Sequence, residues 1–169
     1  MSNTIQTLWV GNKLSTMERL CLSSFVQNGH PIELYSYEDI ENVPDGVVIR
    51  DGNEILSEDM IFEYKHHKSF SGFSNYFRYK LLSEKGGWWV DTDVICLKPF
   101  NLADPLVVCS EEVLPLGEGN THVGSCVIKA PAGNILTKNA FEICMNKKPE
   151  DLIWGEIGPK LVKEMVEKY

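Results

Sequence analysis

The sequence predicts one α/β domain over residues 1–169, in which helices cover both faces of a mostly parallel sheet. Two observations lead to this prediction. Strand-like and helix-like segments alternate along the chain, and no internal repeat, low-complexity tract or linker divides it. Of the 169 residues, 43% are hydrophobic and 24% are charged, which provides enough apolar material for one core and excludes intrinsic disorder.

The first half of the chain opens with a strand followed by a helix. The apolar run Ile5–Gly11 ends in glycine, which is typical of a buried strand. Ser15 and Glu18 have the spacing of a capping box, so a helix is expected to begin there and to end at Asn28-Gly29. The other elements predicted in this half are strands over residues 32–37 and 47–52 and a first helical stretch after residue 53.

The second half is predicted to begin with a helix over residues 71–85, which a Gly-Gly pair ends. The side chains expected in the core from this helix are Phe73, Tyr76, Phe77, Leu81 and Leu82. The apolar run WWVDTDVICLKPF is predicted to be a strand that Pro99 ends. The remaining predicted elements are strands at PLVVCS and VGSCVIKA, a helix over residues 134–145 and a last helix that begins at Pro159.

Composition excludes several classes of function. The chain has 24 Asp and Glu against 16 Lys and Arg, a net charge of −8, which argues against binding to nucleic acid. The polar start and the lack of any apolar stretch of membrane-spanning length predict a cytoplasmic protein without a transmembrane segment. The five cysteines are widely spaced in mostly apolar surroundings, which predicts buried, reduced thiols rather than disulfides or a zinc site.

Two acidic residues, Asp91 and Asp93, interrupt the predicted strand. In extended geometry both carboxylates point to the same side, with Thr92 turned away. Two such carboxylates repel each other unless a cation lies between them or they face water. All-oxygen ligation suits Mg²⁺ or Mn²⁺, which take further ligands from substrate phosphates. The pair therefore indicates a metal site for a diphosphate-bearing substrate, with a solvated turn as the alternative.

Three further side chains are candidates for the same site. Asn75 and Arg78 have i, i+3 spacing and share one helix face. Arg78 either meets a sugar or phosphate near the acids or pairs structurally with Asp91, and residue type leaves both open. Trp9 lies at the carboxyl end of the first strand, where open α/β sheets bind ligands, and either stacks on a nucleotide base or belongs to the core.

The run FSNYFRYKLLSEKGGWWVDTDVICLKPF, Phe73 to Phe100, resembles the sugar-binding region of glycosyltransferase family 32. In that family a helix with an acid and an arginine leads through a Gly pair into an aromatic, apolar strand with a DXD motif. VGSCVIKAPAGNILTKNAFEICM and IWGEIGPKLVKEMVEKY are similar to the later part of the family's α1,4-galactosyl- and α1,4-N-acetylglucosaminyltransferases, and IQTLWVG is similar to their opening strand. The resemblance is weakest over residues 42–68.

This resemblance implies a GT-A-like, Rossmann-like mixed sheet flanked by helices. It also implies a retaining enzyme that uses Mn²⁺ (or Mg²⁺) and moves a hexose from a nucleotide-sugar, above all a UDP-sugar, to a saccharide or lipid-linked acceptor. By matched motif, Asp93 would ligate the metal, and Asp91 would help to hold it and bind donor hydroxyls. Arg78 and Asn75 would contact the donor sugar. Trp9 would stack on the base, and Trp89 would lie beside the nucleotide.

The acceptor side is assigned from position rather than from a motif. Asn120, His122 and Glu156 are the candidates, because loops after strands and helix starts commonly line such sites. The chain departs from the family at Asn75, where the family usually has Asp. It is also expected to lack the family's C-terminal segment, since it stops at Tyr169.

Two other functions remain as alternatives. One is a module that binds a nucleotide-sugar without turnover. The other is a haloacid-dehalogenase-type phosphatase with Asp91 as nucleophile and Asp93 as acid/base, although the acidic element that such enzymes carry later does not follow here. As a transferase in polysaccharide biosynthesis, the protein is expected in the cytoplasm. Any association with the inner membrane is expected to be peripheral and transient.

Overall fold

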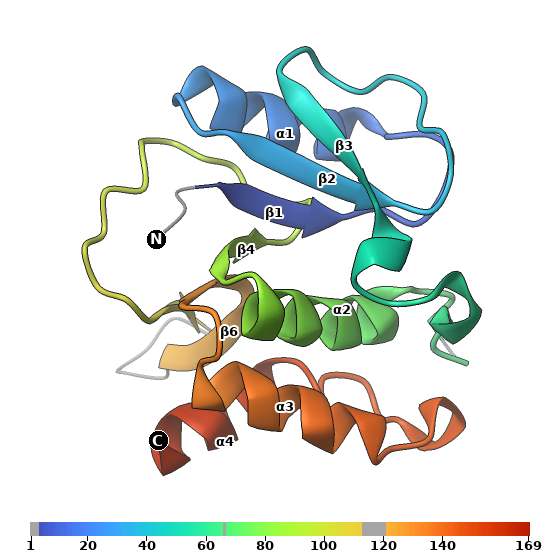
Figure 1. Ribbon diagram of the computed structural model, residues 1–169, viewed down its shortest axis with the longest axis vertical. Helices are drawn as coiled ribbons and strands as arrows, with labels where there is room; N and C mark the ends of the chain where they lie inside the picture. Colours follow the sequence, from blue (N-terminus) through green and yellow to red (C-terminus); the bar gives the residue numbers. More distant parts are fainter. Residues whose placement is uncertain (1–3, 66, 113–120) are drawn as a thin grey trace.

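The computed structural model describes residues 4–65, 67–112 and 121–169. Its centre is a six-stranded sheet in the order β3-β2-β1-β4-β6-β5 (Figure 1). β1, β2, β3 and β4 run parallel, whereas β6 is antiparallel to both β4 and β5. The predicted mixed sheet is therefore confirmed.

The strands are β1 (Ile5–Leu8), β2 (Ile32–Ser36), β3 (Val47–Asp51), β4 (Gly87–Val90), β5 (Val107–Glu112) and β6 (Thr121–Ala130). The α-helices are α1 (Thr16–Gln27), α2 (Ser71–Glu84), α3 (Ile135–Met145) and α4 (Pro159–Lys168). Within the described ranges, no helix combines the length and the apolar character needed to cross a membrane.

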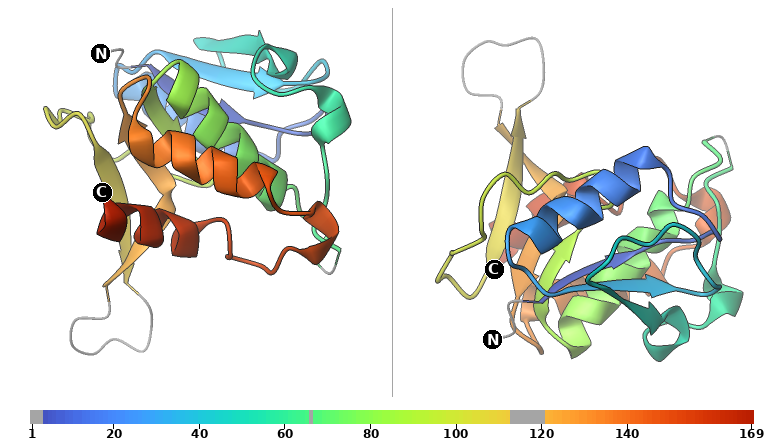
Figure 2. Two further views of the ribbon diagram at one scale, coloured as in Figure 1. Left: turned by 60° about the horizontal axis from the view of Figure 1, so that its bottom comes forward. Right: turned by 90° about the horizontal axis from the view of Figure 1, so that it is seen from above.

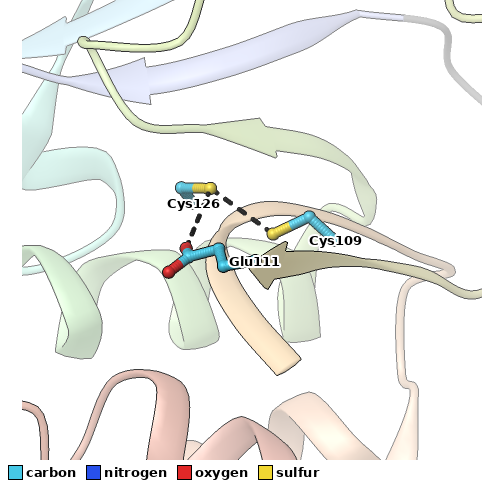
Figure 3. Close-up of side chains that lie close together, drawn as sticks. All are labelled: Cys109, Glu111 and Cys126. Carbon is cyan, nitrogen blue, oxygen red and sulfur yellow. Dashed lines mark hydrogen bonds between the residues drawn. The ribbon is translucent and has the colours of Figure 1, made fainter. Parts of the chain in front are cut away.

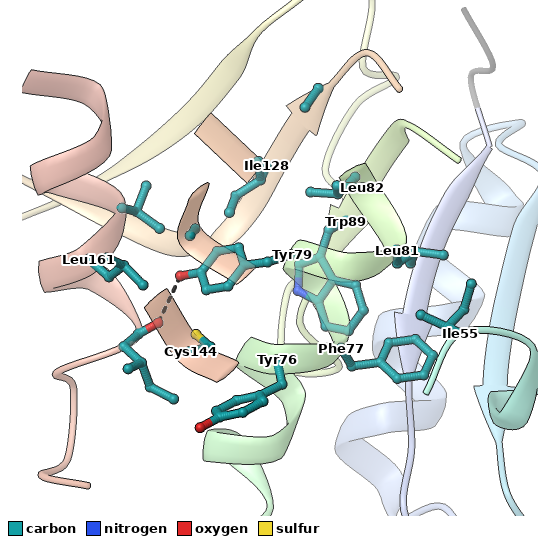
Figure 4. Packing of buried hydrophobic residues seen from close by; sticks show 14 of the residues in the cluster. Ile55, Tyr76, Phe77, Tyr79, Leu81, Leu82, Trp89, Ile128, Cys144 and Leu161 are labelled. Atoms are coloured by element: carbon teal, nitrogen blue, oxygen red, sulfur yellow. Dashed lines mark hydrogen bonds between the residues drawn. The ribbon is translucent and has the colours of Figure 1, made fainter. Parts of the chain in front are cut away.

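Helices cover both faces of the sheet, as the alternating pattern predicts. α1 lies against one face. α2 and α4 lie against the other, α4 on β6, and α3 packs on α2 and α4 (Figures 1 and 2). The neighbouring tryptophans of β4 divide between the two cores, because successive strand residues point to opposite faces. Trp88 belongs to the core cluster that contains Phe25 of α1. Trp89 packs with Phe77 of α2, with ring centres 6.2 Å apart (Figure 4).

The predicted core face of α2 is confirmed. Its five predicted apolar side chains are all buried, and Tyr79 is buried with them. The Tyr79 hydroxyl donates to the carbonyl of Ile157 at 2.8 Å, which ties α2 to the segment before α4 (Figure 4). The Gly-Gly pair ends the helix as predicted: Gly86 has a φ of 66°, and a Cβ there would collide with the backbone of Ala132.

The helical stretch predicted after residue 53 is wrong. The segment forms two short 3-10 turns, Gly52–Glu54 and Glu58–Met60. Side chains close these turns: Asp51 accepts from the N–H of Asn53, and Asn53 in turn accepts from the N–H of Glu58, each at 2.9 Å. Such local side-chain bonds give the backbone an alternative to the α-helix.

The strand predicted up to Pro99 is too long, because β4 ends at Val90. The N–H of Asp91 makes the last ladder bond, to the carbonyl of Cys126 at 2.8 Å. The carbonyl of Asp91 then accepts from the N–H of Val94 at 3.2 Å, which closes a turn. Asp91 and Asp93 are therefore at the end of the strand and in the turn after it, not in one extended run.

The cysteine prediction holds for three of the five residues. Cys21, Cys96 and Cys144 are buried, and burial raises the pKa of Cys21 and of Cys144 to about 12. Cys109 and Cys126 are only half-buried. All five are free thiols.

The capping box of α1 is present in full: Ser15 accepts from the N–H of Met17 at 3.2 Å, and Glu18 accepts from the N–H of Ser15 at 2.6 Å. We expect Ser15→Ala to lower the free energy of unfolding by about 1 kcal/mol, because it leaves a helix N–H without its partner. Urea denaturation measures this change. The matched control is Ser23→Ala within α1, expected within about 0.5 kcal/mol of the parent; equal losses in both variants would contradict the cap.

Candidate functional site

The carboxyl ends of β1 and β4 open into a cavity of about 400 Å³. Its walls come from these two strand ends and from the start of α2, and they include Trp9, Lys68, Arg78, Trp89, Asp91 and Asp93. In open α/β sheets this edge is where ligands bind. The structure therefore brings together five of the six residues predicted for the donor side.

A buried charge pair forms the floor of this cavity. Arg78 has only 3% of its side chain exposed, and its Nη2 lies 2.8 Å from Oδ1 of Asp91. The same oxygen accepts from Trp89 Nε1 at 2.8 Å, and the guanidinium lies 5.1 Å from the centre of the Trp89 ring. Arg78 Nη1 also donates to the carbonyl of Ser125 on β6. Arg78 is thus bound on several sides to the protein itself, which supports the structural pairing left open above.

The electrostatics of Asp91 follow from this arrangement. Desolvation by the surrounding protein raises the pKa of Asp91 above its ordinary value, while the charge of Arg78 and the hydrogen bond from Trp89 act in the opposite direction. The side chain still has 28% of its surface exposed. Arg78 and Trp89 therefore favour the ionised form and leave the second carboxylate oxygen for a ligand.

Asp93 is the less constrained acid. It lines the cavity beside Asp91, and its carboxylate has no hydrogen bond or ion pair within the part of the chain that the structure describes. Two carboxylates at one cavity make an all-oxygen donor set, which fits Mn²⁺ or Mg²⁺ and does not fit a thiophilic ion. These residues therefore fit the metal that the DXD motif implies.

Trp9 and Asn75 have different positions relative to the cavity. Trp9 lines it directly after β1, with its Nε1 donating to the carbonyl of Lys13 at 3.1 Å. Asn75 does not line it: the side chain is 94% buried beside Gly158 and Ser125. Its Oδ1 has no hydrogen-bond partner among the described residues, so it is a buried acceptor without a donor.

Sequence reasoning missed the wall that α2 contributes. Lys68, Ser69, Ser71 and Ser74 line the cavity from the turn before α2 and from its first turns. A helix N-terminus with a nearby lysine favours anionic groups such as phosphates. The signal in the sequence was the Ser-rich start of the helical pattern, but it lies next to the segment in which the predicted secondary structure was wrong.

The acceptor-side candidates meet at a second cavity of about 450 Å³. His122 and Glu156 line it together with Trp154, Lys160 and Lys163. Trp154 is 52% exposed, and a hydrogen bond from Lys147 lowers the pKa of Glu156. Asn120, the third candidate, lies outside the described residues.

Comparisons with known proteins agree with this geometry. A family model described as a glycosyltransferase sugar-binding region containing a DXD motif matches residues 14–112, more than half of the chain. No curated protein sequence matches.

Similar solved structures include the PaToxG glycosyltransferase, with a TM-score of 0.70 at 14% identity over 99% of this chain and 69% of that one. They also include a transferase with two Cys-to-Ser substitutions, with a TM-score of 0.62 at 10% identity over 99% of this chain and 86% of the other. At such low identity these likenesses establish the fold, which is GT-A-like as expected.

We expect Arg78→Leu to lower the free energy of unfolding by about 3 kcal/mol, because it leaves the charge of Asp91 and the carbonyl of Ser125 without their partner. Urea denaturation measures the loss. Lys80→Met is the matched control on the same helix. It removes the partly exposed pair with Glu84 and the contact of Lys80 Nζ with the Phe141 ring, 5.2 Å from its centre, and each contributes less than about 1 kcal/mol. Comparable losses in the two variants would refute the structural role of the buried pair.

Proposed function

Because the chain belongs to the family of glycosyltransferase sugar-binding regions containing a DXD motif, we propose that it is a retaining, metal-dependent glycosyltransferase. Its donor would be a nucleotide-sugar, most simply a UDP-hexose, and its acceptor a saccharide or lipid-linked saccharide in polysaccharide biosynthesis. Residues 1–169 would act as one such domain. The family match favours this reading over the phosphatase alternative.

One observation carries the proposal: both acids of the DXD motif, a buried arginine and two tryptophans surround one cavity at the carboxyl edge of the sheet. Its volume of about 400 Å³ lies within the range of ordinary ligand pockets. Lys68 and the first turn of α2 would face the diphosphate, since both favour negative charge. Trp9, which lines the cavity directly after β1, would stack on the base.

The two acids would divide the work of holding the donor. Asp93, which is free of internal partners among the described residues, would be the main metal ligand, and Asp91 would add its second oxygen or bind a donor hydroxyl. A bound Mn²⁺ or Mg²⁺ would supply Lewis-acid stabilisation of charge on the departing diphosphate. Arg78 and Trp89 would fix the orientation of Asp91. Asn75 is buried and does not line this cavity, so it takes no part in the donor site proposed here.

We favour attack of the acceptor hydroxyl on the same face as the leaving group. The bond from the anomeric carbon to the phosphate oxygen breaks, the bond to the acceptor oxygen forms, and the hydroxyl proton passes to the leaving phosphate. A double displacement needs a separate carboxylate nucleophile. The other acid at the cavity, Glu18, is engaged in the capping box of α1, which supports the single-face route.

The acceptor would bind at the second cavity. Its exposed Trp154 offers an aromatic face of the kind on which sugar rings pack, and His122 and Glu156 offer hydrogen bonds. Trp154 also contacts His67 and Tyr64, with ring centres 4.5 and 5.2 Å away, in the segment that leads to Lys68 and the donor cavity. This contact would place the acceptor next to the donor.

For donor binding, we expect UDP-sugars with Mn²⁺ to raise the melting temperature, since a ligand of the native state stabilises it by mass action. Asp93→Asn should remove the Mn²⁺-dependent part of this rise and lower turnover by about a hundredfold or more. Asp104→Asn, an exposed acid away from the cavity, is the control and should behave as the parent. Thermal shift with UDP, GDP and several UDP-sugars measures binding, and full metal-dependent binding by Asp93→Asn would exclude the metal assignment.

Turnover separates an enzyme from a binding module. NMR of the first product formed reports the anomeric configuration, and retention is the expected outcome. Inversion would rule out the single-face mechanism. Binding of a UDP-sugar with neither transfer nor hydrolysis would identify the donor-binding module instead.

For the acceptor side, Trp154→Ala should raise KM for the acceptor roughly five- to tenfold with little change in KM for the donor, because an aromatic contact contributes on the order of 1 kcal/mol. Steady-state kinetics with each substrate varied in turn measures both values. A larger effect on the donor KM than on the acceptor KM would place Trp154 in the donor site.

A further inference from the structure

Two strands carry a cluster of metal-binding side chains that the proposed reaction does not use. Cys109 and Glu111 lie on β5, and Cys126 lies on β6 (Figure 3). The two sulfurs are 3.4 Å apart, and Cys126 Sγ is 3.5 Å from Oε1 of Glu111. All three ligand atoms lie within 4.8 Å of one another.

These spacings match the edges of a coordination tetrahedron. With Zn–S bonds of about 2.3 Å and Zn–O bonds of about 2.0 Å, tetrahedral geometry gives edges of roughly 3.8 Å between two sulfurs and roughly 3.5 Å between sulfur and oxygen. The observed separations are close to both values. The three ligand atoms therefore already have the spacing that a tetrahedral metal site requires.

The backbone of the β5–β6 pair is shaped to leave room at this point. The ladder shifts register between Val108 and Ser110, so Cys109 lies at a bulge, a feature that redirects a side chain. Opposite it, β6 carries Gly124. A Cβ at Gly124 would lie 2.6 Å from Glu111 Oε1 and 2.7 Å from Cys109 Sγ. Only glycine leaves this space between the ligands empty.

A water molecule would take the fourth position of the site and complete four-fold coordination. His122 is opposite Glu111 in the register, but its ring nitrogens are not among the ligand atoms that lie within 4.8 Å of one another. Cys and Glu are side chains that bind zinc.

We propose that Cys109, Glu111 and Cys126 bind a thiophilic divalent cation of the Zn²⁺ class, at a site separate from the DXD motif. The presence of Glu111 favours a metal over a simple disulfide, because a disulfide has no use for a carboxylate beside the sulfurs. Soft sulfur ligands also distinguish this site chemically from the oxygen ligands of Asp91 and Asp93.

Such an ion would act on the donor cavity through the backbone of β6. The carbonyl of Cys126 accepts from the N–H of Asp91 at 2.8 Å, and the carbonyl of Ser125 accepts from Arg78. Fixing the Cys126 side chain therefore fixes the two carbonyls that hold the buried charge pair. The ion stabilises the position of Asp91 and Arg78 without touching the substrates.

Cobalt(II) titration of the reduced full chain tests the proposal. We expect one Co²⁺ bound at this site, with a sulfur-to-metal charge-transfer band and the visible bands of a tetrahedral site, and we expect Zn²⁺ to displace it. Cys109→Ser and Cys126→Ser should each abolish the charge-transfer band. Cys96→Ser is the matched control: it also leaves four cysteines, and serine retains a donor for the bond that Cys96 makes to the carbonyl of Lys98.

Gly124→Ala tests the shaped space without removing a ligand, and it should weaken cobalt binding about tenfold or more. Asp93→Asn should retain the charge-transfer band, which separates this site from the donor metal site. Absence of the band in the parent, or its persistence in both Cys109→Ser and Cys126→Ser, would overturn the proposal. Oxidation of the two sulfurs to a disulfide, with no cobalt bound by the reduced chain, would overturn it as well.

Discussion

The buried guanidinium of Arg78 is the constraint around which the functional edge of the molecule is built. A charge that is 97% buried is tolerated only where its partners are in place. Those partners come from different parts of the chain: Asp91 after β4, the carbonyl of Ser125 on β6, and Trp89 on β4. Satisfying one side chain therefore fixes α2, β4 and β6 relative to one another. The donor cavity lies where these elements meet, at the carboxyl ends of β1 and β4.

Much of the fold could be predicted because local and long-range signals agree. The capping box at Ser15, the helical spacing of α2 and the alternation of strands with helices each led to elements that the structure contains. The strand predicted up to Pro99 fails at a turn that a backbone bond from Val94 to Asp91 closes, and the predicted helix fails where short side chains bond to nearby backbone. Asp51 and Asn53 convert the predicted helix into 3-10 turns, and periodicity does not reveal such competition.

The candidate site was predictable to the extent that it lies in one continuous motif. Arg78, Trp89, Asp91 and Asp93 fall within sixteen consecutive residues, and the structure places them at one cavity. What joins distant segments was not predictable. Lys68 comes from a segment whose predicted secondary structure was wrong. The close approach of Cys109 and Cys126 depends on a β-bulge, which no pattern of residues in the sequence predicts. Asn75 was carried over from the resemblance, and its buried position shows that a shared helix face does not guarantee a shared cavity.

The strand order has a consequence for how the chain reaches this state. β1 lies between β2, its neighbour in sequence, and β4, and the Gln6 side chain bonds to the carbonyl of Gly86, 80 residues further on. Closing so long a loop costs conformational entropy before the hydrogen bonds between β1 and β4 can form. The pairing of these two strands is therefore expected to limit the folding rate. Until then β1 presents an unpaired edge to other chains. During synthesis, β1 and Trp9 leave the ribosome before β4, Asp91 and Asp93, so the donor cavity cannot form until the later segment has been made.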